Sequence, residues 1–171
     1  MDEMNKSDTA QRSERKLKAE YEELLSVHQK LQVTHEEKIA EIIHSVLFFN
    51  EMNRQSPPEN QKPITFYLST YGGNADDMFA MYDMMRNIRD SSEIHTVGLG
   101  KVMSAGVLLL AAGTKGERRI GKHCRVMIHG VVAGQHGHIA DIENEFSETK
   151  NTQEMYIKAL AEETDMTQKY I

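Results

Sequence analysis

Tryptophan is absent from this chain, and cysteine and proline are scarce, with one cysteine and three prolines among 171 residues. Because Cys124 has no second cysteine to pair with, a disulfide within the chain is excluded, which suits a reducing compartment. The N-terminus has no apolar run typical of a secretory signal. The longest apolar stretches, residues 42–50 and 106–113, are too short to cross a bilayer. We therefore expect a cytoplasmic protein with no membrane association.

Positive charge is also sparse. The net charge is -6, and the longest basic block is Arg118-Arg119, so the sequence gives little support to nucleic-acid binding. The length suffices for one domain with a sizeable core, while much of the polar excess lies in the first forty residues. This distribution predicts a charged N-terminal extension over residues 1–32 and one domain over residues 33–171.

The first part of the chain is expected to hold a polar tail followed by a helix. Residues 1–32 read as a disordered tail running into an exposed helix, with a short strand at 24–27 as the alternative. The first secure helix is predicted to start at Thr34, because Glu37 completes a capping box with it. Pro57-Pro58 ends this unit in a loop.

Strands and helices alternate in the rest of the chain. Residues 64–68, 95–99 and 125–128 read as strands, and 104–112 and 139–164 as helices. Asn74 is placed to cap another helix, with Asp76 and Asp77 in its first turn. A methionine stripe on that helix is predicted to be core. This order indicates an α/β fold with crossover connections.

Three predicted strand ends carry chemistry-bearing residues. Ser104 lies among small residues, His129 precedes Gly130, and the pair Gly72-Gly73 follows the first strand. A serine hydroxyl needs a nearby base, usually histidine, and hydrogen-bond donors for the developing oxyanion. Ala105, in the first turn of a helix, has an amide without a helical partner, and the glycine pair offers a second amide.

Each of these residues alone is more often structural, but their joint presence at strand ends favours nucleophilic catalysis. The alternative role for the histidines is metal binding. His123, His129, His136 and His138 have no recognisable ligand spacing with Cys124 or the carboxylates, so we expect no metal and no other cofactor.

In these residues the chain resembles the proteolytic subunit of the Clp protease, a serine peptidase family. The agreement runs in order from about Thr34 to Ile171. The matching motifs are 66–73 (FYLSTYGG), 81–85 (MYDMM), 100–106 (GKVMSAG), 111–118 (AAGTKGER), 125–129 (RVMIH) and 134–143 (GQHGHIADIE). The resemblance implies a crotonase/ClpP-like fold of repeated ββα-type units with a protruding handle helix.

The resemblance also assigns roles to residues. It implies that Ser104 is the nucleophile and His129 the general base, and that the amides of Gly73 and Ala105 form the oxyanion hole. Peptide substrate would bind as an added strand. Its expected contacts are Gly72, Gly130, Val131 and Val132.

Assembly and partners follow from the same resemblance. It implies a homo-oligomer of stacked seven-membered rings that cleaves unfolded polypeptides inside a chamber. A separate AAA+ unfoldase would use the ATP, and the chain accordingly has no Gly-x-x-x-x-Gly-Lys-Ser/Thr phosphate loop.

Some positions depart from the family pattern. Tyr71 replaces the proline of Ser-Pro-Gly-Gly, and Val131 stands where proline is usual. The family's triad aspartate, with the closing strand and helix, is expected beyond Ile171. The nearest acid, Asp165, falls at a helix turn and is not assigned to the triad.

Three other functions were weighed. A non-catalytic ring subunit would not need Ser104 and His129, and a crotonase-like acyl-CoA enzyme leaves that pair unexplained. A Ser–Lys peptidase would use Lys101, which lies too close in sequence to be a good base.

Overall fold

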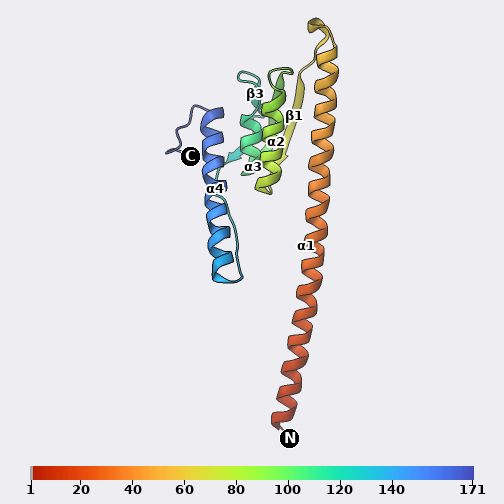
Figure 1. The fold of residues 1–171 in the computed structure, drawn as a ribbon, viewed down its shortest axis with the longest axis vertical. Helices are drawn as coiled ribbons and strands as arrows, with labels where there is room; N and C mark the ends of the chain where they lie inside the picture. The colour runs from red at the N-terminus through yellow and green to blue at the C-terminus, as the bar shows by residue number, and fades with distance from the viewer. Residues whose placement is uncertain (1) are drawn as a thin grey trace. The chain divides into compact units, whose positions relative to one another are not determined.

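The structure is a computed structural model that describes the backbone of residues 2–171 (Figure 1). Among the first 35 residues it describes the side chains of residues 15, 16, 18, 19, 21–23 and 26. The chain divides into two compact units, one ending at Ile42 and the other covering Ile43–Ile171. The candidate site lies entirely within the second unit.

The secondary structure predicted for the first part of the chain is wrong, because helix α1 runs without interruption over Asp2–Gln55. The expected helix start at Thr34, the unstructured tail and the alternative strand at 24–27 are all replaced by helix. Neither glycine nor proline occurs before Pro57, so no residue forces a break, and one capping box is too weak to impose one. Four leucines of residues 1–32 lie outside the described side chains: Leu17, Leu24, Leu25 and Leu31. The boundary between 1–32 and 33–171 stays a prediction.

A parallel sheet forms the frame of the second unit. Its strands are β1 (Ile64–Thr70), β2 (Ile94–Met103), β3 (Arg118–Ile120) and β4 (Arg125–Met127), and a short 3-10 helix, Pro58–Asn60, precedes them. Strand β2 pairs in parallel with β1 on one side, and with β3 and then β4 on the other. The predicted α/β crossover topology is confirmed. Strand β3 was not predicted, because its three residues include two arginines.

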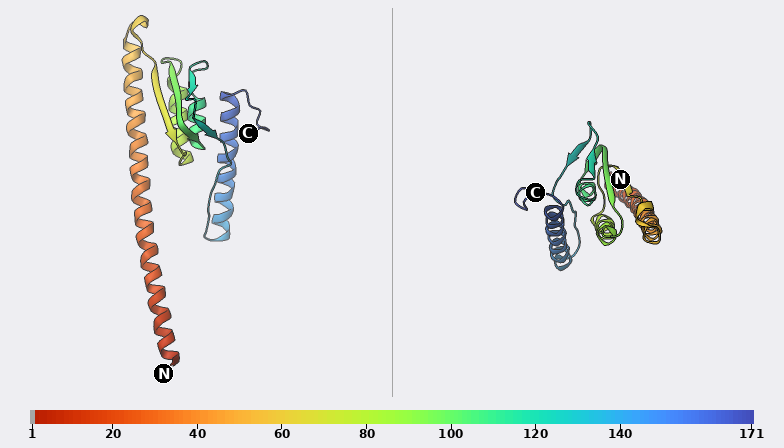
Figure 2. Two further views of the ribbon diagram at one scale, coloured as in Figure 1. Left: turned by 180° about the vertical axis from the view of Figure 1, so that it is seen from behind. Right: turned by 90° about the horizontal axis from the view of Figure 1, so that it is seen from above.

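Three helices lie on one face of this sheet: α2 (Ala75–Ile88), α3 (Ala105–Ala111) and α4 (Ile139–Glu163) (Figure 2). Helix α3 contacts β1, β2 and both other helices. The core between these layers includes Ile94 and Val102 of β2, Leu108 of α3 and Leu160 of α4, all fully buried. Because β2 alternates faces, Val97 and Leu99 lie on the face away from these helices.

The predicted start of α2 is confirmed. The Asn74 side-chain oxygen accepts hydrogen bonds from the amides of Asp76 and Asp77, at 2.6 and 3.3 Å. The methionine stripe is core as expected, since Met78, Met81 and Met85 are at most 4% exposed. Capping therefore fixes where α2 begins, directly after the Gly72-Gly73 turn.

A buried carboxylate joins α4 to α2. Glu163 is 2% exposed and accepts hydrogen bonds from Tyr82 at 3.0 Å, from Arg86, and from Arg89 at 3.1 Å. Its backbone carbonyl accepts a further bond from Arg118 of β3. Burial alone would raise the pKa of Glu163, but the bonds from Arg86 and Tyr82 and the two arginine charges outweigh it and lower the pKa.

A helix that spans a bilayer needs about 20 consecutive, mostly apolar residues. Among residues 2–171, every helix is too short or too polar to span a bilayer.

Candidate active site

Ser104 lies at the junction between β2 and α3 in a strained backbone conformation. Its φ of 52° and ψ of -125° make it the one non-glycine residue with positive φ in the described chain. Its amide donates to the Met127 carbonyl of β4 at 2.9 Å, and its carbonyl accepts from Val107 at 2.9 Å and from the Tyr156 hydroxyl at 3.0 Å. Such strain persists only where surrounding structure holds it, and three bonds do so here.

Gly72 supports Ser104 from the β1 side. A Cβ atom on Gly72 would lie 2.6 Å from the Ser104 Cβ and 3.0 Å from the Met103 carbonyl oxygen. Gly72 also has a φ of 102°, which residues with side chains rarely adopt. Gly72 was expected to contact substrate, but the structure places it against Ser104 and not among the residues that line the pocket.

Replacing Gly72 by alanine should therefore destabilise the fold by about 2 kcal/mol or more, because it combines a clash with an unfavourable φ. Urea unfolding measures this change. Gly134→Ala is the matched control, since a Cβ there meets nothing within 4 Å, and it should change stability by less than about 0.5 kcal/mol. Equal effects of the two substitutions would contradict the close packing of Gly72.

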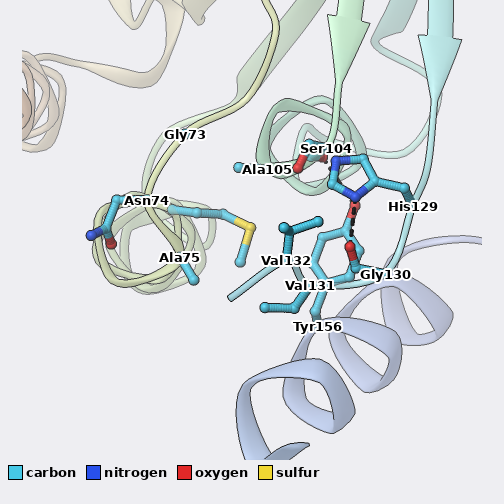
Figure 3. Close-up of a pocket in the computed structure, with 11 residues that line it drawn as sticks. Gly73, Asn74, Ala75, Ser104, Ala105, His129, Gly130, Val131, Val132 and Tyr156 are labelled. Carbon is cyan, nitrogen blue, oxygen red and sulfur yellow. Dashed lines mark hydrogen bonds between the residues drawn. The ribbon is translucent and has the colours of Figure 1, made fainter. Parts of the chain in front are cut away.

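His129 follows β4, and its ring lies beside Ser104 in Figure 3. Its Nδ1 lies 2.5 Å from the Gly130 carbonyl oxygen. A carbonyl can only accept, so Nδ1 carries a proton, and in the neutral ring it is Nε2 that has the lone pair. Among the described residues no carboxylate oxygen lies within 4.0 Å of the His129 ring nitrogens. The backbone thus selects the tautomer that a general base at Nε2 requires.

All the predicted site residues except Gly72 line one pocket of about 310 Å³. Ser104, Ala105, His129 and Gly73 all line it, as do Gly130, Val131 and Val132 (Figure 3). Asp165 is not among the lining residues. Sequence reasoning missed four others that line it: Asn74, Ala75, Met78 and Tyr156.

Helix α4 holds the pocket through two polar side chains, of which Tyr156 lines it and Gln153 lies behind Val131. Tyr156 is 4% exposed, and its burial raises the pKa of the hydroxyl to about 12, so it remains a donor to the Ser104 carbonyl. Gln153 accepts a hydrogen bond from the Val131 amide at 2.5 Å. The sequence prediction gave Tyr156 no role at the site. A buried tyrosine usually needs a partner for its hydroxyl, which is the signal that could have revealed it.

Two backbone amides in the pocket are available as donors. In the described part of the chain, the N–H groups of Gly73 and Ala105 have no hydrogen-bond partner, and both residues line the pocket. The Ser104 hydroxyl likewise makes no hydrogen bond to a described residue, and such bonds often tighten only when substrate is present. A nucleophile, a base and two donors are the parts that acyl transfer requires.

Comparison with known proteins gives one consistent result. A family model described as Clp protease matches residues 9–171. The ATP-dependent Clp protease proteolytic subunit 2 of Synechococcus sp. (strain CC9605) is 36% identical over 107 residues, covering 63% of this chain and 53% of that protein. Subunit 2 of Prochlorococcus marinus (strain NATL2A) is 37% identical over 110 residues, covering 64% and 54%. The chain therefore spans about half the length of the curated relatives it matches.

Proposed function

This chain belongs to the Clp protease family, and from that membership we propose that it is a serine endopeptidase subunit that hydrolyses peptide bonds of unfolded proteins. The predicted family and fold class are confirmed. The observation that carries the proposal is the pocket in which Ser104, His129 and the free amides of Gly73 and Ala105 meet.

In the proposed reaction, Ser104 Oγ attacks the carbonyl carbon of the scissile bond while Nε2 of His129 takes its proton. The negative charge on the carbonyl oxygen is stabilised by the amides of Gly73 and Ala105. The C–N bond then breaks, and His129 returns the proton to the leaving amine. Water hydrolyses the Ser104 ester by the same steps, so the cycle needs no cofactor.

The segment 130–132 is the proposed binding edge for the substrate backbone. The Val131 amide points to Gln153 of α4, so along an extended chain the neighbouring backbone groups of Gly130 and Val132 face the other way. Val132 is 84% exposed, which leaves room for an added strand.

Assembly and energy supply are part of the proposal. We propose a homo-oligomeric chamber of stacked seven-membered rings in the cytoplasm, fed by a separate AAA+ unfoldase. The relatives are named ATP-dependent proteolytic subunits, whereas this chain has no phosphate-binding loop. ATP hydrolysis therefore fits a partner better than this chain.

The proposal is tested by replacing the base. His129→Gln should lower cleavage of an unfolded protein and of a short fluorogenic peptide by at least about 100-fold. His136→Gln is the matched control, because His136 is exposed and does not line the pocket, and it should stay within about twofold. If His129→Gln cleaved as fast as the original protein, His129 would not be the base and a Ser–Lys peptidase using Lys101 would be the better description. If the original protein cleaved neither substrate, a non-catalytic ring subunit would be.

A further inference from the structure

We propose that Glu93, His95 and Glu117 form a binding site for a divalent zinc ion. None of the three lines the pocket around Ser104, so the site is separate from the proposed peptidase centre. Each residue offers one ligand atom, and the three atoms all lie within 4.8 Å of one another.

Sheet topology brings these residues together. Glu93 precedes β2 and His95 is two residues further on, so both side chains lie on the same face of the extended chain. Strand register places Thr96 opposite Arg118, and the Thr96 amide donates to the Glu117 carbonyl at 3.3 Å. Glu117 therefore lies next to His95. The set joins two segments far apart in sequence, which is why ligand spacing did not reveal it.

The spacing of the ligand atoms suits zinc. His95 Nε2 lies 3.4 Å from Glu93 Oε1 and 3.7 Å from Glu117 Oε2. Ligand atoms that bind zinc at about 2.0–2.2 Å in a tetrahedron are roughly 3.3–3.6 Å apart. Both distances to His95 are close to this spacing, and because the three atoms all lie within 4.8 Å of one another, side-chain movement of the two glutamates would complete the set.

His95 supplies the second observation. Its Nε2 atom is buried and has no hydrogen-bond partner, although two carboxylates lie close to it. A buried nitrogen without a partner is unfavourable, and such atoms often mark an ion or water site. A cation between the three groups would bind the lone pair and offset both negative charges.

The ligand set favours zinc over other common divalent ions. One imidazole nitrogen with two carboxylate oxygens suits zinc, whereas magnesium and calcium prefer oxygen ligands alone. Glu117 Oε2 also pairs with Arg119 at 2.8 Å, so zinc would share this oxygen with the arginine or displace it. Three protein ligands leave the fourth position of the tetrahedron to water.

Calorimetric titration with zinc chloride tests the site. Glu93→Gln should weaken zinc binding by at least about tenfold and His95→Gln by at least about 100-fold. Glu93 is exposed, so its substitution should not disturb folding, which urea unfolding without zinc can verify. His123→Gln is the control for adventitious binding, because His123 is exposed and outside the set, and it should stay within about twofold.

Cobalt(II) provides a spectroscopic readout of the same ligands. The original protein and His123→Gln should give the visible absorption of a tetrahedral cobalt site, and His95→Gln should lose it. Zinc affinity that is unchanged in both Glu93→Gln and His95→Gln would overturn the proposal. So would the absence of zinc binding in the original protein.

Discussion

Alanine in place of Ser104 is expected to lower peptide hydrolysis by at least about 10³-fold while changing the free energy of unfolding by less than about 1 kcal/mol. The rate should fall because Oγ is the atom proposed to attack the substrate. Stability should be almost unchanged, because the Ser104 hydroxyl makes no hydrogen bond to a described residue and the three bonds that hold Ser104 use its backbone.

Ser147→Ala is the matched control for this substitution. The Ser147 hydroxyl donates to the Glu143 carbonyl on α4 at 3.1 Å and does not line the pocket. It should leave the hydrolysis rate within about twofold. Initial rates on one fluorogenic peptide and urea unfolding of all three proteins provide the comparison. Retained activity in Ser104→Ala would exclude Ser104 as the nucleophile.

Removing the buried carboxylate between α2 and α4 should have the largest effect on stability. Glu163→Ala is expected to lower the free energy of unfolding by about 2–4 kcal/mol, because it leaves Tyr82, Arg86 and Arg89 without their shared acceptor. This loss is smaller than that expected for a fully buried ion pair, because the two arginine side chains are each 35% exposed and water screens their charge. Denaturant unfolding at neutral pH measures this difference.

Glu162→Gln is the control for charge alone. Its carboxylate is 48% exposed and lies 3.9 Å from Arg86, so its loss should change stability by less than about 1 kcal/mol. If Glu162→Gln and Glu163→Ala lowered the free energy of unfolding equally, the burial of Glu163 would not explain its contribution to stability.

The effect of Glu163 should depend on pH in a defined direction. Because its pKa is lowered on folding from the ordinary value of 4.5, its contribution is complete above that pH. The contribution is lost as pH falls through the lowered pKa, where the folded protein must also take up the proton. The stability difference between the original protein and Glu163→Ala should therefore shrink at acid pH. A difference that grew on acidification would contradict the ion-pair explanation.

Local signals predicted the parts of the fold that they control. The Asn74 cap, the methionine stripe of α2 and the strand before Gly72 are each encoded by neighbouring residues, and each is confirmed. Helix α1 was mispredicted because a cap at Thr34 was given more weight than the absence of any helix breaker. Strand β3 depends on pairing with β2, so its own three residues carry little signal.

Some features of the candidate site could be predicted from local sequence, and others depend on tertiary packing. Ser104 and His129 stand out in sequence because glycines follow the strand ends that carry them, and the structure places both in one pocket. The different positions of Gly72 and Gly73 could not be inferred, since only the packing against Ser104 distinguishes them. The bond from Tyr156 to the Ser104 carbonyl joins distant segments, so no local pattern encodes it.

Reaction with a fluorophosphonate, followed by mass mapping of the adduct, tests the central claim most directly. Attack by an activated serine forms an Oγ–P bond and expels fluoride, so it reports the nucleophile without depending on a substrate. We predict a single adduct on Ser104 that is lost in Ser104→Ala and forms far more slowly in His129→Gln. An adduct on another serine, or none at all under conditions that label a known serine hydrolase, would contradict the account.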